Sequence, residues 1–335
     1  MREVPLSILM PYRDAAQTLD EALASVLMER TPEFELIVID DGSKDSGSNI
    51  VKSWAARDAR VLCVEGSGGG IADALKRGMS HSRAPFVARM DSDDISLPGR
   101  FARTLAELNR DERLAAVGTR AEAFPSDVVQ EGMRRFVEWQ NTLIDPNDHH
   151  REIFIDAPLC NPSCTIRRSA IERVGGYLDD GTAEDYSLWL RLDEAHFGLA
   201  KLPWVGLRWR HGAGRATFTQ QQLGREQMRA LKSGFLARRC LADGRPVTIW
   251  GAGRDGKRTA RALEQHGLWA RRFVDIDSKK IGRTARGVPV ESTGDLDPRR
   301  EFVIASVAAR GARQAIRLHL NALEFSEGAD FLCTA

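Results

Sequence analysis

Short apolar runs alternate with helical patterns through the first part of the chain. The apolar runs have the length of buried strands and fall at 6–10, 34–39, 60–64 and 85–90. We expect the first of them to end at Pro11. The segments between the runs are predicted to be helices, at 17–28, 45–56 and 71–81. Strands that alternate with helices predict a parallel sheet with right-handed crossovers.

The remaining sequence changes character twice. Helix and strand patterns continue across 100–118, 162–177 and 184–196, whereas 125–160 is polar with weaker periodicity. A basic helical stretch at 213–245 precedes a new β–α–β pattern, whose segments fall at 247–251, 256–266, 273–275, 302–307 and 330–332. The chain length favours two domains. We therefore predict an α/β domain over 1–215, a helical connector over 216–245 and a smaller α/β domain over 246–335.

Acidic clusters follow two of the predicted strands. Asp40-Asp41-Gly42-Ser43 follows one strand, and Asp91-Ser92-Asp93-Asp94 follows another. Ligands of parallel α/β sheets bind beyond the carboxyl ends of the strands, which favours a binding site here. Carboxylates two residues apart on an extended segment can converge on Mg²⁺ or Mn²⁺, which prefer oxygen ligands. The alternative interpretation is a pair of solvated turns or helix caps.

Charge and cysteine content exclude several classes of partner. The chain of 335 residues carries 48 basic and 47 acidic side chains, so no global field favours nucleic acid. Its five cysteines are odd in number and scattered, which indicates free thiols in a reducing compartment. No apolar run approaches the roughly 20 residues of a membrane helix, and the first residues lack the apolar core of a signal peptide. We expect a cytoplasmic protein.

Several motifs occur in an order that resembles family 2 of the inverting glycosyltransferases. They are Pro11-Tyr12, Asp40 to Asp45, Gly70-Ile71 with Ala74-Leu75, Ala88 to Arg100, Gly175-Gly176-Tyr177 and Glu184 to Arg191. The resemblance covers about residues 5 to 215. It implies an α/β fold of the GT-A type, in which a nucleotide-binding half precedes an acceptor half.

The resemblance also implies roles for individual residues. Asp41 resembles the family residue that contacts the uracil of the donor. Asp91 and Asp93 resemble the two aspartates of the family's DxD motif, which meet the ribose and phosphates of the donor and the metal ion. Asp185 resembles the catalytic base, with Glu184 as its neighbour. The implied donor-binding residues are Pro11, Tyr12, Asp40, Asp41, Asp91, Ser92 and Asp93. The alternative for Glu184-Asp185 is an acidic first helical turn, which the helix dipole favours.

The implied reaction transfers a sugar from a nucleotide-diphosphate donor to a hydroxyl of a saccharide or glycolipid. Among the nucleotides, the resemblance favours UDP. Mg²⁺ or Mn²⁺ would assist it, in the assembly of a polysaccharide or glycoconjugate. Because lipid-linked acceptors are common in the family, a peripheral association with the inner face of the membrane is an alternative to a purely cytoplasmic location.

The sequence departs from the family pattern at several points. Arg13 stands where Asn is usual, Lys76 replaces another Asn, and Asn161 precedes Pro162 in place of His. Trp209-Arg210-His211 is one residue short of a closing Tyr-Arg-x-His segment. A role for His211 as a metal ligand beside Asp93 is therefore a hypothesis, and a packed histidine is the alternative.

The last predicted domain carries a dinucleotide-binding fingerprint. Gly251, Gly253 and Gly256 lie between a strand and a helix, and Asp275 ends the next strand. The domain is half the size of a complete dinucleotide fold and resembles small Rossmann-like domains found beside sugar-modifying enzymes. It would bind a nucleotide or nucleotide sugar, or serve only in packing and dimerisation. Two further hypotheses follow for the chain, an NAD(P)-dependent oxidoreductase and a non-catalytic nucleotide-sugar sensor.

Overall fold

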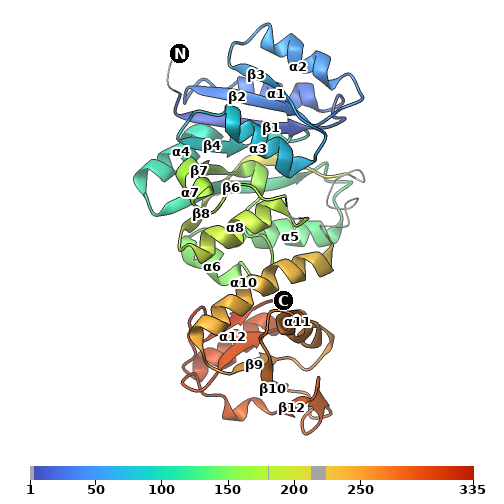
Figure 1. Cartoon of the computed structure of the whole chain (residues 1–335), viewed down its shortest axis with the longest axis vertical. Coiled ribbons are helices and arrows are strands. Elements are labelled where there is room, and N and C mark those ends of the chain that lie inside the picture. The colour runs from blue at the N-terminus through green and yellow to red at the C-terminus, as the bar shows by residue number, and fades with distance from the viewer. Residues whose placement is uncertain (1–3, 180, 213–223) are drawn as a thin grey trace. The chain divides into compact units, whose positions relative to one another are not determined.

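The computed structural model describes residues 4–179, 181–212 and 224–335. The chain divides into two compact units. The first comprises Met1–His149 and Ala157–Gln221, and the second comprises His150–Asp156 and Gln222–Ala335. In Figure 1 the first unit runs from blue to yellow, and the second is mostly orange and red.

A mixed sheet forms the centre of the first unit. In the described residues its strand order is β3-β2-β1-β4-β7-β6-β8-β5. The strands are β1 (Leu6–Tyr12), β2 (Phe34–Asp40), β3 (Val61–Glu65), β4 (Phe86–Arg89), β5 (Ile95–Ser96), β6 (Leu114–Phe124), β7 (Thr165–Arg167) and β8 (Gly198–Arg210). The strands β1 to β4 are parallel, as predicted, and β7 runs antiparallel to both β4 and β6.

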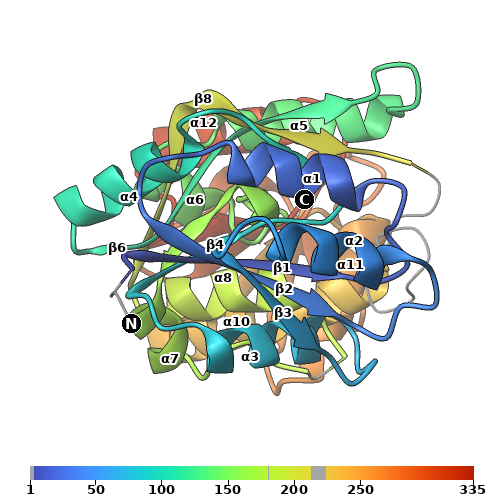
Figure 2. The ribbon, with the colours of Figure 1, turned by 90° about the horizontal axis from the view of Figure 1, so that it is seen from above.

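Helices cover both faces of this sheet. The described helices of the first unit are α1 (Leu19–Leu27), α2 (Gly47–Ala55), α3 (Ile71–His81), α4 (Arg100–Arg110), α5 (Glu131–Thr142), α7 (Arg168–Arg173) and α8 (Glu184–Glu194). The helix α6 (Pro146–Glu152) begins in the first unit, and its last residues belong to the second. Figure 2 shows α1 on one side of β1 and β2 and α3 on the other. On the α3 side the approach is close, because a Cβ at Gly78 would lie 3.0 Å from Ile39 and 3.1 Å from Leu9. The central strands are therefore buried on both faces.

The strand β1 does not end at Pro11 as expected but continues to Tyr12. Proline is excluded from sheets where its missing N–H leaves a ladder unpaired. Backbone bonds show that Tyr12 faces β2, whereas Leu9 faces β4. Pro11 therefore also faces the β4 side, and the pairing of β1 with β4 has already ended at Leu9 and Arg89. The proline costs no hydrogen bond at this position.

Several elements of the first unit were not predicted. They are the long strand β8, the helices α5 and α6, and the extension of β6 as far as Phe124. Pro203 and Gly206 interrupt the apolar alternation of β8, and residues of this kind normally argue against a strand. Pairing with β6 overrides that local preference, at the expense of register shifts around Thr119 and Arg120.

The second unit is a smaller α/β structure. Its sheet order in the described residues is β11-β12-β10-β9-β13-β14, and all its strands except β11 run parallel. The strands are β9 (Val247–Trp250), β10 (Ala270–Val274), β11 (Thr284–Ala285), β12 (Val288–Glu291), β13 (Phe302–Ala305) and β14 (Phe331–Cys333), and the helices are α10 (Arg225–Asp243), α11 (Arg254–Glu264) and α12 (Ala312–Ala322). The part of the predicted connector at 216–223 lies outside the described residues.

The apolar core of the second unit includes Trp250, Val274, Val303 and Phe331, which come from neighbouring parallel strands. Within residues 4–179, 181–212 and 224–335, no helix combines the length and the apolar character needed to cross a membrane.

Candidate functional site

The carboxyl ends of β1, β2 and β4 meet at one edge of the first sheet. Tyr12 and Asp40 are opposite each other in the β1–β2 register, and Asp91 follows β4 by two residues. The two acidic clusters, which follow different strands in the sequence, therefore lie at the same edge of the sheet. The parallel topology accounts for their meeting, because parallel strands all end on the same side.

Asp40 organises the loop after β2. Its carboxylate accepts a hydrogen bond from the Ser43 amide at 2.8 Å. Burial opposes ionisation of this group, but hydrogen bonds from Ser43 and from the Tyr12 hydroxyl outweigh it and lower the pKa of Asp40. Burial and the same contact raise the pKa of Tyr12. The ionised Asp40 thus ties together the ends of β1 and β2.

Asp41 connects β2 with the glycine-rich turn before α3. Its carboxylate is buried and accepts the amide of Gly70, at 3.0 Å from Oδ2. Gly70 has φ +94°, a conformation that favours glycine. The guanidinium of Arg13, a residue that departs from the family pattern, lies 3.9 Å from the same carboxylate. Arg13, which stands where the family usually has Asn, therefore lies beside Asp41, the residue that resembles the nucleobase contact.

Asp91, Asp93 and Asp94 form a compact acidic cluster. Each offers a carboxylate oxygen, and these oxygens lie within 4.8 Å of one another. It is the one group of three or more His, Cys, Asp or Glu side chains with such spacing in the part of the chain that the structure describes. Carboxylate oxygens so close together suit a hard divalent cation such as Mg²⁺ or Mn²⁺.

Neighbouring elements hold the backbone of this cluster. The amide of Arg210, at the end of β8, donates to Asp94 Oδ1 at 2.7 Å, and its Nε donates to the carbonyl of Asp93 at 2.6 Å. The Thr18 hydroxyl donates to the carbonyl of Ser92 at 3.0 Å. The unpredicted strand β8 thus fixes the segment that carries the predicted metal-binding residues.

Arg89 is a site residue that the sequence reasoning did not single out. Its side chain is 1% exposed, and Nη2 donates to Asp91 Oδ1 at 2.7 Å. A buried charge requires a partner or becomes costly. An arginine within an apolar strand, two residues before an acidic cluster, was the signal that could have identified it.

Glu184 and Asp185 begin α8 and belong electrostatically to the same site. Burial raises the pKa of both carboxyls; repulsion from Asp185 adds to the shift of Glu184, and Asp91 adds to both. Arg89 opposes these shifts. The structure therefore brings the predicted base within the electrostatic reach of the acidic cluster. A raised pKa makes Asp185 a stronger proton acceptor while it remains ionised.

Two other predicted positions have packing contacts. Arg191 donates from Nη1 to the carbonyl of Gly176 at 2.8 Å and so holds the turn before α8. His211 is buried with its ring edge against Trp209, at a centroid distance of 4.8 Å. It is not a member of the Asp91–Asp93–Asp94 cluster.

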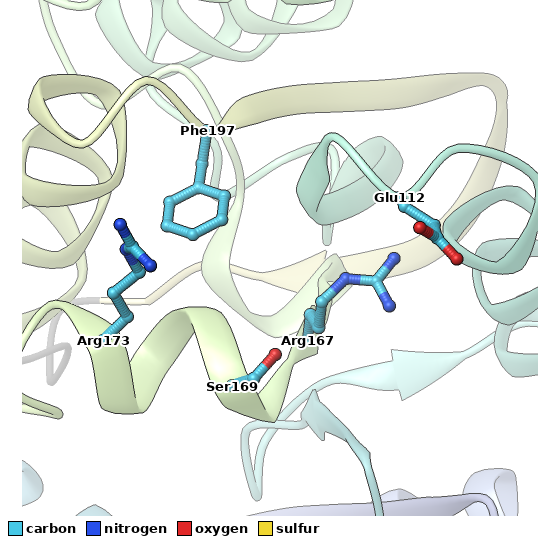
Figure 3. Close-up of a pocket in the computed structure, with 5 residues that line it drawn as sticks. All are labelled: Glu112, Arg167, Ser169, Arg173 and Phe197. Atoms are coloured by element: carbon cyan, nitrogen blue, oxygen red, sulfur yellow. The ribbon is translucent and has the colours of Figure 1, made fainter.

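A cavity of about 450 Å³ lies elsewhere in the first unit. Figure 3 shows its lining residues, which are Glu112, Arg167, Ser169, Arg173 and Phe197. Glu112 and Phe197 precede the starts of β6 and β8, and Arg167 ends the antiparallel β7. The cavity is thus at the sheet edge opposite the acidic cluster and contains none of the predicted site residues.

The glycine-rich loop of the second unit is closely packed. A Cβ at Gly256 would lie 1.8 Å from the carbonyl oxygen of Gly251, so only glycine fits there, whereas a Cβ at Gly253 would meet nothing within 4 Å. Asp275 accepts hydrogen bonds from the Ala252 amide (2.9 Å), the Asp277 amide (3.0 Å) and Lys280 Nζ (3.0 Å). Burial opposes ionisation of Asp275, but these bonds prevail and lower its pKa. Its carboxylate therefore closes the loop.

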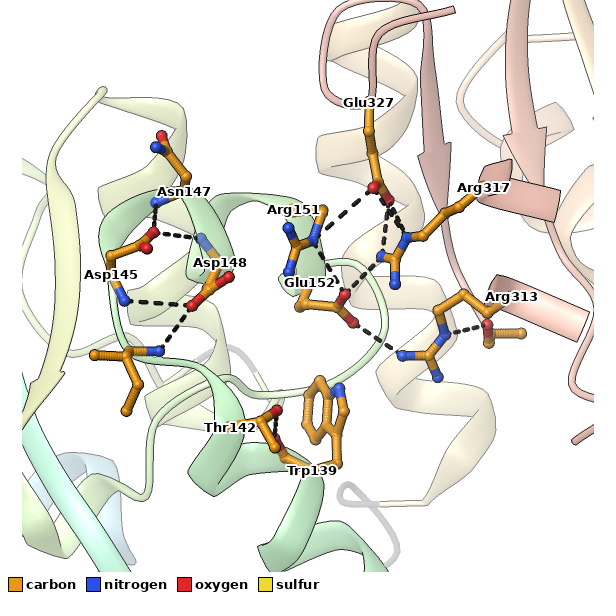
Figure 4. A network of polar contacts seen from close by, with 12 residues as sticks. Trp139, Thr142, Asp145, Asn147, Asp148, Arg151, Glu152, Arg313, Arg317 and Glu327 are labelled. Carbon is orange, nitrogen blue, oxygen red and sulfur yellow. Dashed lines mark hydrogen bonds and ion pairs between the residues drawn. The ribbon is translucent and has the colours of Figure 1, made fainter. Parts of the chain in front are cut away.

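Ion pairs hold the segment 150–156 within the second unit. Figure 4 shows Glu152, which is buried, between Arg313 (2.9 Å) and Arg317 (2.6 Å). Arg317 also pairs with Glu327 at 2.8 Å. The same view shows Asp145, whose carboxylate accepts the amides of Asn147 and Asp148 at the start of α6.

Comparison with known proteins agrees with the resemblance. The profile of Glycosyl transferase family 2 matches residues 7–175. EpsE of Bacillus subtilis is 30% identical over 200 residues, which cover 57% of this chain and 68% of EpsE. The UDP-Gal:alpha-D-GlcNAc-diphosphoundecaprenol beta-1,3-galactosyltransferase of Escherichia coli is 28% identical over 189 residues, which cover 55% of this chain and 66% of that enzyme.

Solved structures show the same fold. TarS of S. aureus, in complex with UDP-GlcNAc, superposes with a TM-score of 0.57 at 16% identity, over 79% of this chain and 73% of that chain. A mannosyltransferase from Pyrobaculum calidifontis, in complex with GDP-Man and Mn²⁺, gives a TM-score of 0.51 at 16% identity, over 80% and 74%. The predicted GT-A type of α/β fold is confirmed, together with a second, smaller sheet.

Proposed function

Because the chain belongs to glycosyl transferase family 2, we propose that it transfers a sugar with inversion from a UDP-sugar to an acceptor hydroxyl. Its relatives include glycosyltransferases of polysaccharide biosynthesis, among them an amylovoran enzyme. The proposed acceptor is a saccharide or a glycolipid. The proposed place is the cytoplasm, where an acceptor of the glycolipid kind would bring the protein to the inner face of the membrane.

One observation carries this proposal. The acidic cluster after β4 gathers three carboxylate oxygens within 4.8 Å of one another, and its member Asp91 is near enough to Asp185, at the start of α8, to raise the pKa of that carboxyl. A glycosyl transfer needs these two kinds of group together, since one must face the leaving diphosphate and the other must face the incoming hydroxyl.

The acidic cluster fits Mg²⁺ or Mn²⁺. Asp93 would hold the cation, with Asp91 and Asp94 beside it, since all three offer oxygens within 4.8 Å of one another. When bound, the cation neutralises the negative charge that builds up on the departing diphosphate. The complex of the mannosyltransferase with Mn²⁺ supports the choice of ion.

The other residues of the site position the two substrates. Asp41, Tyr12 and Asp40 are at the ends of β1 and β2, where the nucleotide is proposed to bind. Asp185 takes the proton of the acceptor hydroxyl, whose oxygen forms a bond to the anomeric carbon as the bond to the diphosphate breaks. UDP leaves on the opposite face, so a single displacement inverts the configuration.

The second unit has an accessory role in this proposal. Asp275, the residue that would bind a ribose, already has three hydrogen-bond donors. Gly256 is required by the close approach of Gly251. The fingerprint is therefore accounted for by packing of the loop, and this favours a structural role over the binding of NAD(P) or of a sensed nucleotide sugar.

A thermal-shift screen followed by a transfer assay tests the function. UDP, GDP, their sugars and NAD(P)(H) are added with and without Mn²⁺, and nucleotide release and the anomeric configuration of the product are then measured. A ligand at about 100 times its dissociation constant stabilises the fold by roughly 2.7 kcal/mol. A Mn²⁺-dependent shift with UDP and an inverted product support the proposal. A shift with NAD(P)(H) alone, or UDP-sugar binding without turnover on any acceptor, contradicts it.

A further inference from the structure

We propose that Arg89 is a positioning residue that acts as the resident counter-cation of the active site. It holds Asp91 in place and balances the charge of Asp185, so that acidic groups from two motifs can occupy one site. The inference rests on the proposed function only in taking these carboxylates as the active-site groups.

The guanidinium of Arg89 is anchored rather than mobile. Arg89 is the last residue of β4 and is 1% exposed. Its Nη1 donates to the carbonyl of Leu9 at 3.1 Å, and Nη2 donates to Asp91 Oδ1 at 2.7 Å. Because β1 and β4 fix the guanidinium, it determines where the Asp91 carboxylate lies.

The surrounding charges explain why a cation is needed here. Arg89 acts electrostatically on Glu184 and Asp185 as well as contacting Asp91. Burial and the neighbouring Asp185 raise the pKa of Glu184 to about 8, so this carboxyl is mostly protonated at neutral pH, and Asp91 and Asp185 are the carboxylates that Arg89 balances. The remaining excess of negative charge leaves the site able to attract a divalent cation, while the strongest repulsion is relieved. Removal of one partner from a buried charged group is strongly destabilising.

Arg100 provides a matched comparison. It is also 1% exposed and lies beside Arg89, since its guanidinium donates to the carbonyl of Arg89 at 3.4 Å. Its other hydrogen bonds go to neutral groups, the Ser96 hydroxyl (2.9 Å) and the carbonyl of Pro162. The hydrogen bonds of Arg100 thus go to neutral groups, and Asp94 and Glu29 act on it only electrostatically, whereas Arg89 forms a direct ion pair with Asp91.

A double-mutant cycle on the full chain separates the two roles. We expect Arg89→Gln to lower the unfolding midpoint by roughly 10 °C. Asp185→Asn should restore at least half of that loss, after subtraction of its own effect, because one of the opposed charges is gone. The same Asp185→Asn change should not restore Arg100→Gln. Equal restoration of both arginine variants, or of neither, would overturn the proposal.

Mn²⁺ binding without nucleotide supplies a second measurement. Arg89→Gln should bind Mn²⁺ about tenfold more tightly in calorimetry, because one positive charge has been removed near the cluster. Weaker binding would contradict the proposal. If Arg89→Gln alone does not fold, a soluble Arg89→Gln/Asp185→Asn double variant supports the proposal. Failure of that double variant beside a soluble Arg100→Gln/Asp185→Asn overturns it. None of these measurements requires sugar transfer, so an inactive wild-type protein would refute the function alone.

Discussion

The two units carry similar motifs at the ends of strands but satisfy them differently. In the first unit, Asp91, Asp93 and Asp94 crowd together, and Asp91 and Asp185 repel each other. In the second unit, Asp275 receives two amides and a lysine. The comparison teaches that unbalanced charge distinguishes a binding site from a structural loop, even where both motifs resemble nucleotide-binding signatures.

Loss of the proposed base is expected to have the largest effect. Asp185→Asn removes the proton acceptor, and general-base catalysis contributes about 10²–10⁴-fold to a rate. We expect kcat to fall by about 10³-fold while UDP-sugar binding persists. UDP release measures the first quantity and thermal shift the second. Glu194→Gln, at the other end of α8, is the control and should stay near wild type. Near-normal transfer by Asp185→Asn would refute the assignment of the base.

Asp93→Ala tests the metal half of the same site. Removing one oxygen ligand from the cluster should weaken Mn²⁺-dependent UDP binding by about 10-fold or more. Calorimetry with and without Mn²⁺ measures the change. Asp275→Asn, an acidic residue that also follows a strand but lies in the other unit, should leave this binding unchanged. If both variants bind UDP equally in Mn²⁺, the difference drawn between the two units is wrong.

Gly256→Ala tests the structural reading of the second unit. The added Cβ would collide with the carbonyl of Gly251 at 1.8 Å, and overpacking of this kind costs typically about 1–3 kcal/mol, or more against backbone. Urea unfolding should show the loss, and kcat should remain near that of the wild type. Gly253→Ala is the matched control, because its Cβ would meet nothing within 4 Å. An equal loss in both variants would remove the packing argument.

The last test concerns how the contribution of Asp275 to stability depends on pH. Its folded-state pKa is lowered, so it stabilises the fold above its unfolded pKa of about 3.9 and loses that contribution as pH falls through the lower folded value. Asp275→Asn should lower stability at neutral pH by about 1.5–3 kcal/mol, the range for charge-assisted hydrogen bonds. The difference from wild type should shrink in acid. Urea unfolding at pH 7 and pH 3 measures it, and a constant difference would contradict the pKa argument.

Much of the fold could be predicted where local and tertiary preferences agree. The strands β1 to β4 and the helices between them follow apolar runs and helical spacing, so the predicted segments match the observed ones within a few residues. The strand β8 was missed because Pro203 and Gly206 oppose a strand locally. Its stability comes from pairing with β6, a segment distant in the sequence.

The candidate site shows the same division. Asp91, Asp93 and Asp185 were identified from motif resemblance, and the common electrostatic field of Asp91 and Asp185 is visible only in the folded chain. The contact of Arg89 with Asp91 was not predicted, because the position of an arginine in a strand does not show which carboxylate its side chain contacts.

The sequence by itself determined the α/β class, the two parallel-sheet patterns and the acidic groups available at strand ends, because residue periodicity and local composition encode these features. Only the tertiary structure decided which of those groups remain unbalanced. Asp275 is neutralised by neighbours that the loop geometry supplies, whereas the Asp91 cluster faces further carboxylates. The reason is physical, since the electrostatic energy of a carboxylate depends on distances to other charges and on burial, and both are set by how remote segments pack.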